Sequence, residues 1–460
     1  MTGVAGGTDA APPAPERIGL AAAAAVWLKI GLLGFGGPAG QIALMHRELV
    51  ERRRWLGERR FLHALNYCML LPGPEAMQLA TYVGWLMHRT LGGIVAGTLF
   101  VLPGLLVIVA LAVLYVQHGQ LAPVAAVFAG LKAAVLAIVV QAVLRIGGRV
   151  LHGPRAWLLA AAAFLALAVF SLPFPLVVAG AALVGLAGWL PARPSAHGAP
   201  AGDREGLVDR ALREGRLGHT VPSRGRALRT LAIWLPVWWL PVLAVVALTG
   251  SDSVLTQMGL LFSQIAVLGF GGAYAVLAWV GQAMVETSGW LSTGQMLDGL
   301  ALAETTPGPL VLVLPFVGFL VAHGHETALA SPLLAGLAAA LLVAWVTFVP
   351  CLLWIFLGGP WVEAIRANRR VSAALAAVTA AVVGVILNLA LWFALNVLFA
   401  QQGTVGLAGL EIAVPVPASL DPVAAGLVAL AFVLVFALRA GLLVVLSLMA
   451  LAGLLANTLL

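Results

Sequence analysis

The sequence predicts an all-α integral membrane protein built from two repeats that lie in the bilayer in opposite orientations. Of its 460 residues, 62% are hydrophobic and 9% are charged, whereas soluble domains carry about 25% charged residues. Apolar stretches of about 20 residues recur along the chain, and that length suits a membrane-spanning helix. An internal repeat and the placement of arginine predict the two orientations.

The elements follow from the order of these stretches. A flexible tail is expected at residues 1–17, and the first repeat, residues 18–190, holds stretches at 18–45, 61–88, 91–117, 121–145, 156–171 and 175–190. Backbone groups in lipid must bond within their own segment, so each stretch is predicted to be helical. The polar segment 191–228 predicts a cytoplasmic linker, and one extra transmembrane helix is expected at 229–249. The second repeat, residues 250–460, holds stretches at 254–285, 295–322, 330–358, 371–400, 421–438 and 441–459.

The internal repeat is carried by uncommon motifs. Gly-Phe-Gly-Gly at 34–37 recurs 235 residues later at 269–272, and Pro-Gly-Pro at 72–74 recurs at the same spacing at 307–309. Further along the chain the offset becomes 247, where Pro103 matches Pro350. The change of 12 predicts an insertion near residues 323–331.

Arginine placement reverses between matching loops. The loop at 47–60 carries six arginines, whereas its counterpart at 287–298 has no Lys or Arg. The segment 117–123 lacks both residue types, whereas its counterpart carries Arg366, Arg369 and Arg370. Because Lys and Arg mark cytoplasmic loops, matching loops face opposite sides, as in inverted repeats. This scheme gives each repeat two broken, re-entrant hairpins and about four spans, with the N-terminus in the cytoplasm. A plain count of 13 spanning segments is the alternative.

Both repeated motifs place helix-breaking residues inside apolar segments. Pro38 and Pro74 favour the first turn of a new half-helix. The N-terminus of a half-helix exposes unpaired N–H groups and about half a positive charge. Four such ends that meet near the midplane would form an anion site made of backbone. Simple packing kinks are the alternative interpretation.

Charged residues inside the apolar segments add to this candidate site. The only two lysines, Lys29 and Lys132, lie in apolar stretches, where a cation is costly and indicates function, unless it snorkels to an interface. Glu75 and Glu304 flank the Pro-Gly-Pro motifs as helix caps or as proton-carrying groups. The candidate substrate-binding set is Lys29, Gly34, Phe35, Gly36, Gly37, Pro38, Pro72, Gly73, Pro74, Glu75, Gln78, Lys132, Gly269, Phe270, Gly271, Gly272, Glu304, Thr305, Thr306, Pro307, Gly308 and Pro309.

Several function classes find no support in the sequence. It contains no phosphate-binding Gly-x-x-x-x-Gly-Lys-[Ser/Thr] loop, no Gly-x-Ser-x-Gly elbow and no Cys/His cluster. Cys68 and Cys351 lie in apolar stretches and predict buried thiols. We therefore expect a transporter rather than an enzyme, with no cofactor, metal or nucleic-acid partner; the oligomeric state, including a homodimer, is left open.

The motifs resemble those of a known family. Phe35–Pro38, Arg52–Leu56 and Leu70–Glu75 are similar to motifs of the chromate ion transporter family, and Phe270–Gly272, Gly289–Leu291 and Ala303–Pro309 resemble the second domain of its long members. The resemblance covers nearly the whole chain outside the tail and the linker. It implies secondary active export of chromate across the bacterial inner membrane and chromate resistance. Another oxyanion such as sulfate, or an organic anion, is the alternative, because Leu33-Gly34 stands where many members carry Thr-Ser.

Overall fold

The computed structural model describes residues 18–190, 205–327, 329, 331–362, 368–407 and 410–459. The expected N-terminal tail and residues 191–204 of the expected linker lie outside this part of the chain. The first repeat comprises α1 (Leu20–Leu33), α2 (Gly37–His46), a π-helical turn η1 (Arg47–Arg52), α3 (Glu58–Cys68), α4 (Glu75–His118), α5 (Ala122–Val150), α6 (Pro154–Ala168) and α7 (Phe174–Leu186).

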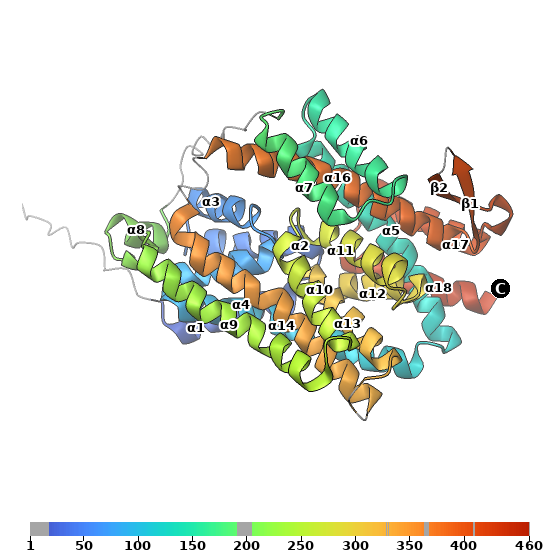
Figure 1. Ribbon diagram of the computed structural model, residues 1–460, viewed down its shortest axis with the longest axis horizontal. Coiled ribbons are helices and arrows are strands. Elements are labelled where there is room, and N and C mark those ends of the chain that lie inside the picture. The colour runs from blue at the N-terminus through green and yellow to red at the C-terminus, as the bar shows by residue number, and fades with distance from the viewer. Residues whose placement is uncertain are drawn as a thin grey trace, which may run out of the picture.

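The linker region and the second repeat continue the helical architecture (Figure 1). The linker region contains α8 (Leu207–Arg213), the short turn η2 (Gly218–Thr220) and α9 (Arg224–Thr249). The second repeat comprises α10 (Val254–Leu268), α11 (Ala273–Gly281), η3 (Gln282–Thr287), α12 (Thr293–Thr305), η4 (Leu310–Leu312), α13 (Val313–Gly324), α14 (Pro332–Gly358), η5 (Gly359–Trp361), α16 (Arg369–Leu398), β1 (Gln402–Leu407), β2 (Leu410–Pro415), η6 (Pro417–Ser419), α17 (Pro422–Phe432), η7 (Val433–Ala437) and α18 (Leu442–Leu459).

Three differences from the expected elements stand out. The antiparallel pair β1 and β2 was not predicted; it projects at the end of the molecule that also holds α17 and α18 (Figure 1). The expected linker contains the helix α8, and the extra helix α9 begins at Arg224 rather than at residue 229. The all-α class holds for the rest of the described chain.

The elements of the two repeats correspond at fixed offsets. The π-helical turns η1 and η3 lie 235 residues apart, and α5 and α16 begin 247 residues apart, at Ala122 and Arg369. The last two helices of each repeat lie 268 apart, since α6 begins at Pro154 and α17 at Pro422. Long π-helical turns are rare, so their recurrence at the offset of the sequence motifs supports a duplicated architecture.

Local insertions explain the changes of offset. In the first repeat α4 continues through a kink at His88 and Arg89, where the backbone leaves helical geometry. In the second repeat α13 ends at Gly324 and α14 begins at Pro332, as the predicted insertion requires. The strands β1 and β2, between α16 and α17, account for the further change to 268.

The chain turns back on itself at the first motif. Lys29 Nζ on α1 lies 2.9 Å from Glu48 Oε1 on η1, and the rings of Trp27 and Trp55 lie 6.4 Å apart. Both pairs join a residue before the break at residues 34–36 to one well after it, so α1 and α2–η1 form a helical hairpin. A straight helix with a rise of about 1.5 Å per residue would separate these partners by more than 20 Å.

The second motif produces a similar hairpin in both repeats. Tyr67 on α3 and Tyr82 on α4 have ring centroids 5.5 Å apart across the break at residues 69–74. In the second repeat, a Cβ on Gly299 of α12 would lie 2.8 Å from the ring of Phe316 on α13. These short helices are therefore paired arms on either side of a break.

The two repeats are intertwined through their last helices. In Figure 1, α6 and α7 of the first repeat lie along α16 of the second, and α17 and α18 lie beside α5. The equivalent helices α5 and α16 are antiparallel, because Lys132 near the start of α5 shares a cavity with Asn396 near the end of α16, and Gly147 lies against Val383.

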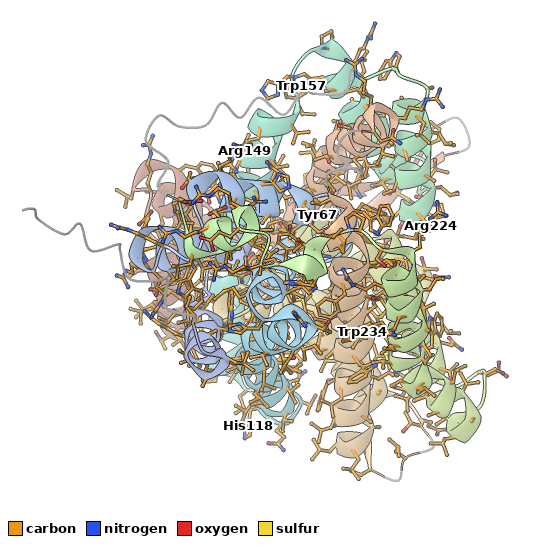
Figure 2. All side chains as sticks on the ribbon, turned by 90° about the vertical axis from the view of Figure 1, so that its left-hand side faces the viewer. Tyr67, His118, Arg149, Trp157, Arg224 and Trp234 are labelled. Atoms are coloured by element: carbon orange, nitrogen blue, oxygen red, sulfur yellow. The ribbon has the colours of Figure 1, made fainter. Side chains whose placement is uncertain are left out.

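The exterior of the molecule is apolar. Among the described residues, five helices are long and apolar enough to cross a membrane: α4, α5, α9, α14 with η5, and α16. Large apolar side chains such as Leu106, Trp157, Leu183 and Leu248 are exposed on the surface. Figure 2 shows Trp157 and His118 at opposite edges, with Tyr67, which is 0% exposed, among the packed helices. A soluble protein would bury such residues, so the chain is a multi-pass membrane protein.

The linker helix α8 is docked on the arginine-rich loop of the first repeat. Val208 N–H donates to the Trp55 carbonyl oxygen at 2.9 Å, and Asp209 accepts the Gly57 N–H at 2.6 Å and pairs with Arg60 at 3.1 Å. Downstream, His219 Nε2 bonds to the Trp85 carbonyl oxygen at 2.9 Å. The linker is thus tied to the first repeat at both ends of its described part.

The intertwined helices give a first prediction. A side chain on Gly384 of α16 would meet the carbonyl oxygen of Ala160 on α6, so Gly384→Leu should destabilise the protein by about 1–3 kcal/mol through overpacking. The control is Gly180→Leu on α7, an exposed helical glycine with nothing within 4 Å; it should stay within about 0.5 kcal/mol of the parent. Unfolding midpoints in detergent measure the stability of both variants. Equal midpoints would contradict the close packing of α6 against α16.

His219 gives a prediction about pH. Burial lowers the pKa of His219 below its usual value, and Arg89 and Arg226 act in the same direction. The docked form is therefore neutral, and the contribution of His219 to docking is present above about pH 6.5 and lost as the pH falls through the lowered pKa. Hydrogen exchange of residues 205–223 should accelerate between pH 7.5 and pH 5, after correction for intrinsic rates. His219→Gln keeps a donor without titrating, so its exchange should lose this pH dependence.

Candidate functional site

The four breaks meet in pairs at the centre of the protein. Gly73 N–H donates to the carbonyl oxygen of Gly269 at 3.2 Å, and Gly308 N–H donates to that of Gly34 at 3.0 Å. Gly73 and Gly308 are equivalent by the offset of 235, as are Gly34 and Gly269. The second break of each repeat is therefore bonded to the first break of the other repeat by the same contact.

Glycine is required in these breaks by backbone geometry. The φ angles of Gly36 and its equivalent Gly271 are +92° and +96°, and those of Gly73 and Gly308 are +107° and +91°. Residues with a Cβ rarely adopt this region. The breaks also approach other helices closely, since Gly308 lies next to Gly104 of α4 and a Cβ on Gly73 would lie 2.8 Å from Cys351 Sγ. Gly104 and Cys351 are themselves equivalent by the offset of 247.

Each break leads into a new helix start. Pro38 lies in the first turn of α2, Pro74 precedes α4, Gly272 precedes α11, and Pro309 precedes the turn η4 that leads into α13. No side chain of the described residues caps any of these four starts. The first N–H groups of each helix place a partial positive charge at the break.

In the first repeat, amide side chains line the breaks. Gln41 Nε2 donates to the Gly34 carbonyl oxygen at 3.2 Å and also to that of Gly308, and Gln78 Nε2 donates to the Pro72 carbonyl oxygen at 2.6 Å. Both side chains are fully buried. The sequence had indicated Gln78 but not Gln41, whose contact with Gly308 joins residues 267 apart in the chain.

Two carboxylates lie at the other helix starts. A Cβ on Gly272, at the start of α11, would lie 3.3 Å from Glu75 Oε1, and Glu75 Oε2 is buried without a hydrogen-bond partner. Glu304, which is 3% exposed, accepts a hydrogen bond from the Tyr274 hydroxyl at 3.0 Å. Tyr274 also lies close to Gly37 at the start of α2. The structure therefore brings Glu75, Gly272, Tyr274, Glu304 and Gly37 together.

The remaining candidates come from both repeats. Thr305 and Thr306 donate to carbonyl oxygens of their own helix, those of Leu302 and Ala303, at 2.8 and 3.1 Å. Phe35 and Gly36 border a second cavity of about 270 Å³ beside the start of α18. Phe270 is half-buried next to Gly271.

The two lysines lie away from the breaks. Lys29 is held by Glu48, which also accepts bonds from Arg52 at 2.9 Å and lies 3.6 Å from Arg53. A helical side chain leans toward the start of its helix, so Lys29 points away from the break at Gly34. Lys132 pairs with Asp298 of α12 at 3.1 Å and borders a cavity of about 460 Å³.

A chain with an apolar exterior and a polar centre built from broken helices defines a class, the multi-pass membrane transporters. Residues 21–186 and 256–454 match the chromate transporter family. The chain belongs to that family.

Curated relatives agree with this assignment. The chain is 34% identical over 387 residues to a chromate transport protein of Pseudomonas aeruginosa, with 82% of this chain and 81% of the relative covered. It is 31% identical over 364 residues to a probable chromate transport protein of Synechococcus elongatus, covering 78% and 81%. A chromate transport protein of Cupriavidus metallidurans is 29% identical over 362 residues, covering 78% and 79%. No solved structure matches the chain.

The contact between Cys351 and the second break gives a further prediction. Gly73→Ala adds a Cβ both in a strained backbone region and 2.8 Å from Cys351 Sγ, whereas Gly36→Ala adds one at a similar φ with no atom within 3.6 Å. We expect Gly73→Ala to cost about 1–3 kcal/mol more stability, and Cys351→Ala to remove much of that excess. A double-mutant cycle on unfolding midpoints measures this coupling, and strict additivity would contradict the contact.

Proposed function

We propose that the protein is a secondary active exporter of chromate across the bacterial inner membrane and that it confers chromate resistance. The observation that carries the proposal is the meeting of four uncapped helix starts at breaks that both repeats share. Backbone N–H groups at such ends bind tetrahedral oxyanions without a dedicated cation. The names of the curated relatives support chromate as the substrate.

Two inverted repeats in the membrane complete the proposed architecture. In this scheme the broken hairpins are re-entrant, the N-terminus and the linker lie in the cytoplasm, and α9 inverts the second copy. The opposite directions of α5 and α16 support this scheme, as do the arginine-free loops at one end of the protein. Rocking of one repeat against the other would then expose the central site to alternate sides.

The membrane potential supplies a driving force for export. Moving two negative charges out through 100 mV, inside negative, is worth roughly 4.6 kcal/mol, about three decades of concentration. ATP hydrolysis is therefore unnecessary. Glu75 is the candidate for coupling to protons, because a carboxylate at the start of α11 repels a second anion unless it carries a proton.

Sulfate or an organic anion is the alternative substrate. Both the backbone site and Lys132 would accept any tetrahedral dianion of similar size. Competition between sulfate and chromate for transport separates the candidates: inhibition by sulfate with measurable sulfate flux would extend the substrate range, and flux of sulfate alone would replace chromate as the substrate.

Chromate flux in proteoliposomes tests the proposal with a matched pair of glycines. Gly272 has φ +85° and ψ −177°, and Gly250 has φ +85° and ψ 166°. An Ala residue therefore meets the same backbone cost at both positions, but only position 272 lies beside Glu75 and the start of α11. Gly272→Ala should lower potential-driven chromate flux at least about tenfold, while Gly250→Ala retains it.

Two results would count against the proposed function. Absence of chromate flux in the parent protein, under an imposed potential, would remove the substrate assignment. Equal flux in the two glycine variants would leave the transporter in place but remove the breaks as its anion site.

A further inference from the structure

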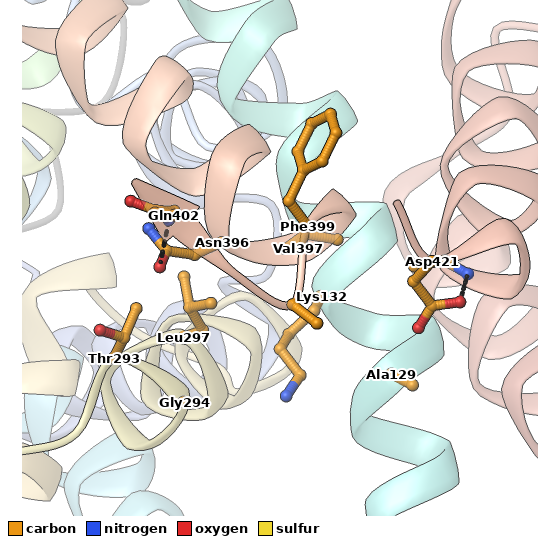
Figure 3. Close-up of a pocket in the computed structure, with 12 residues that line it drawn as sticks. Ala129, Lys132, Thr293, Gly294, Leu297, Asn396, Val397, Phe399, Gln402 and Asp421 are labelled. Carbon is orange, nitrogen blue, oxygen red and sulfur yellow. Dashed lines mark hydrogen bonds between the residues drawn. The ribbon is translucent and has the colours of Figure 1, made fainter. Parts of the chain in front are cut away.

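One cavity of the described structure lies outside the central breaks. It has a volume of about 460 Å³ and lies between the first half of α5, the start of α12, the end of α16 and the start of α17. Figure 3 shows Lys132 extending from α5 into the space beside α12. The polar side chains that border the cavity are Lys132, Thr293, Asn396, Gln402 and Asp421.

The cavity opens at the end of the protein that lacks basic loops. Several lining residues belong to the segments 287–298 and 399–421. These segments contain no Lys or Arg, and neither does the segment 117–123 before α5. Under the rule that basic residues mark the cytoplasmic side, this end faces outward. Lys132 is therefore a cation in the wall of an outward-facing cavity. At this end of the protein a basic residue does not serve to mark a cytoplasmic loop.

Lys132 is held by a carboxylate that is itself fixed in place. Its Nζ lies 3.1 Å from Asp298 Oδ1, and the two side chains are 24% and 13% exposed. The other oxygen, Asp298 Oδ2, accepts the Tyr115 hydroxyl at 2.8 Å. The Tyr115 ring packs edge-on against Phe128 and Phe316, with centroids 5.4 Å away in each case. Asp298 is thus immobilised, whereas Lys132, on a flexible stem, has two further N–H donors to offer.

Three other polar side chains in the cavity wall are bonded to nearby groups of the protein. Asp421 accepts the N–H groups of Val423 and Ala424 at the start of α17, at 2.8 and 3.0 Å. Gln402 Nε2 donates to Asn396 Oδ1 at 2.9 Å, and Asn396 Nδ2 to the Trp392 carbonyl oxygen at 2.7 Å. The first residues of α12, Thr293 and Gly294, add the positive end of a 13-residue helix to the cavity.

The ion pair occurs in one repeat only. By the offsets of 247 and 235, the equivalents of Lys132 and Asp298 are Thr379 and His63. The Thr379 hydroxyl donates to the Leu375 carbonyl oxygen of its own helix at 2.8 Å. The repeat therefore does not duplicate this ion pair at the equivalent positions.

We propose that this cavity is an outer subsite of the transport path, in which the exported oxyanion dianion binds Lys132 in place of Asp298. The proposal rests on the proposed function and adds a second binding position to it. A dianion attracts the ammonium group more strongly than a single carboxylate does. When the anion leaves, Lys132 returns to Asp298, so the outer face releases its product without leaving an unpaired cation.

The test is the KM for chromate measured separately from each face of oriented proteoliposomes. Lys132→Gln should raise the KM at the face without basic loops by about tenfold or more, with the KM at the other face changed less than about twofold, and Lys132→Arg should restore most of the loss. Asp298→Asn should lower the KM at the same face about threefold to tenfold, because the competing anion is gone. The control is Arg213→Gln, which removes an ion-paired cation on α8 and should leave both values unchanged.

Each outcome decides the matter. An unchanged outer KM in Lys132→Gln, or equal rises at both faces, would overturn the subsite while leaving chromate transport intact. Should Lys132→Gln fail to fold, Asp298→Asn carries the test, because only a lysine shared between two anions predicts a lower KM; an unchanged or higher value overturns the proposal. Absence of flux in the parent protein would remove the proposed function and the subsite together.

Discussion

The architecture depends on two backbone hydrogen bonds, from Gly73 to Gly269 and from Gly308 to Gly34. A break deep in a membrane protein exposes peptide groups that lipid cannot satisfy. Here a break of each repeat donates a hydrogen bond to a break of the other repeat. Glycine occupies these points because the φ angles are positive and the neighbouring groups approach closely.

Sequence reasoning found the positions of the breaks but not their partners. Gly and Pro act locally, through φ angles and missing N–H groups, so their effect is readable from a single chain. The pairing of Gly308 with Gly34, and the contact of Gln41 with both, join residues far apart in the chain and arise only once the repeats are intertwined. The helix α8 and the strands β1 and β2 were missed for a related reason, since α8 is docked by specific partners on the loop of the first repeat rather than by a long apolar pattern.

The sequence alone also could not distinguish the roles of Lys29 and Lys132. Both carried an identical signal, a cation inside an apolar stretch, and composition could not separate them. The difference lies in their partners. Lys29 joins Glu48 in a cluster with Arg52 and Arg53, on the loop that the linker covers. Lys132 faces a cavity and a single carboxylate. A dianion would attract Lys132 more strongly than its present partner, Asp298, does. Lys29 borders neither the cavity of about 460 Å³ nor that of about 270 Å³.

The two repeats share backbone geometry at the central breaks but differ in the side chains that line them. The central breaks are equivalent in both repeats, yet the first contributes Gln41, Gln78 and Glu75, whereas the second contributes Tyr274 and Glu304. In the proposed mechanism these different side chains would set the affinity for the anion in each state. The direction of net flux would still be set by the membrane potential and the concentration gradient.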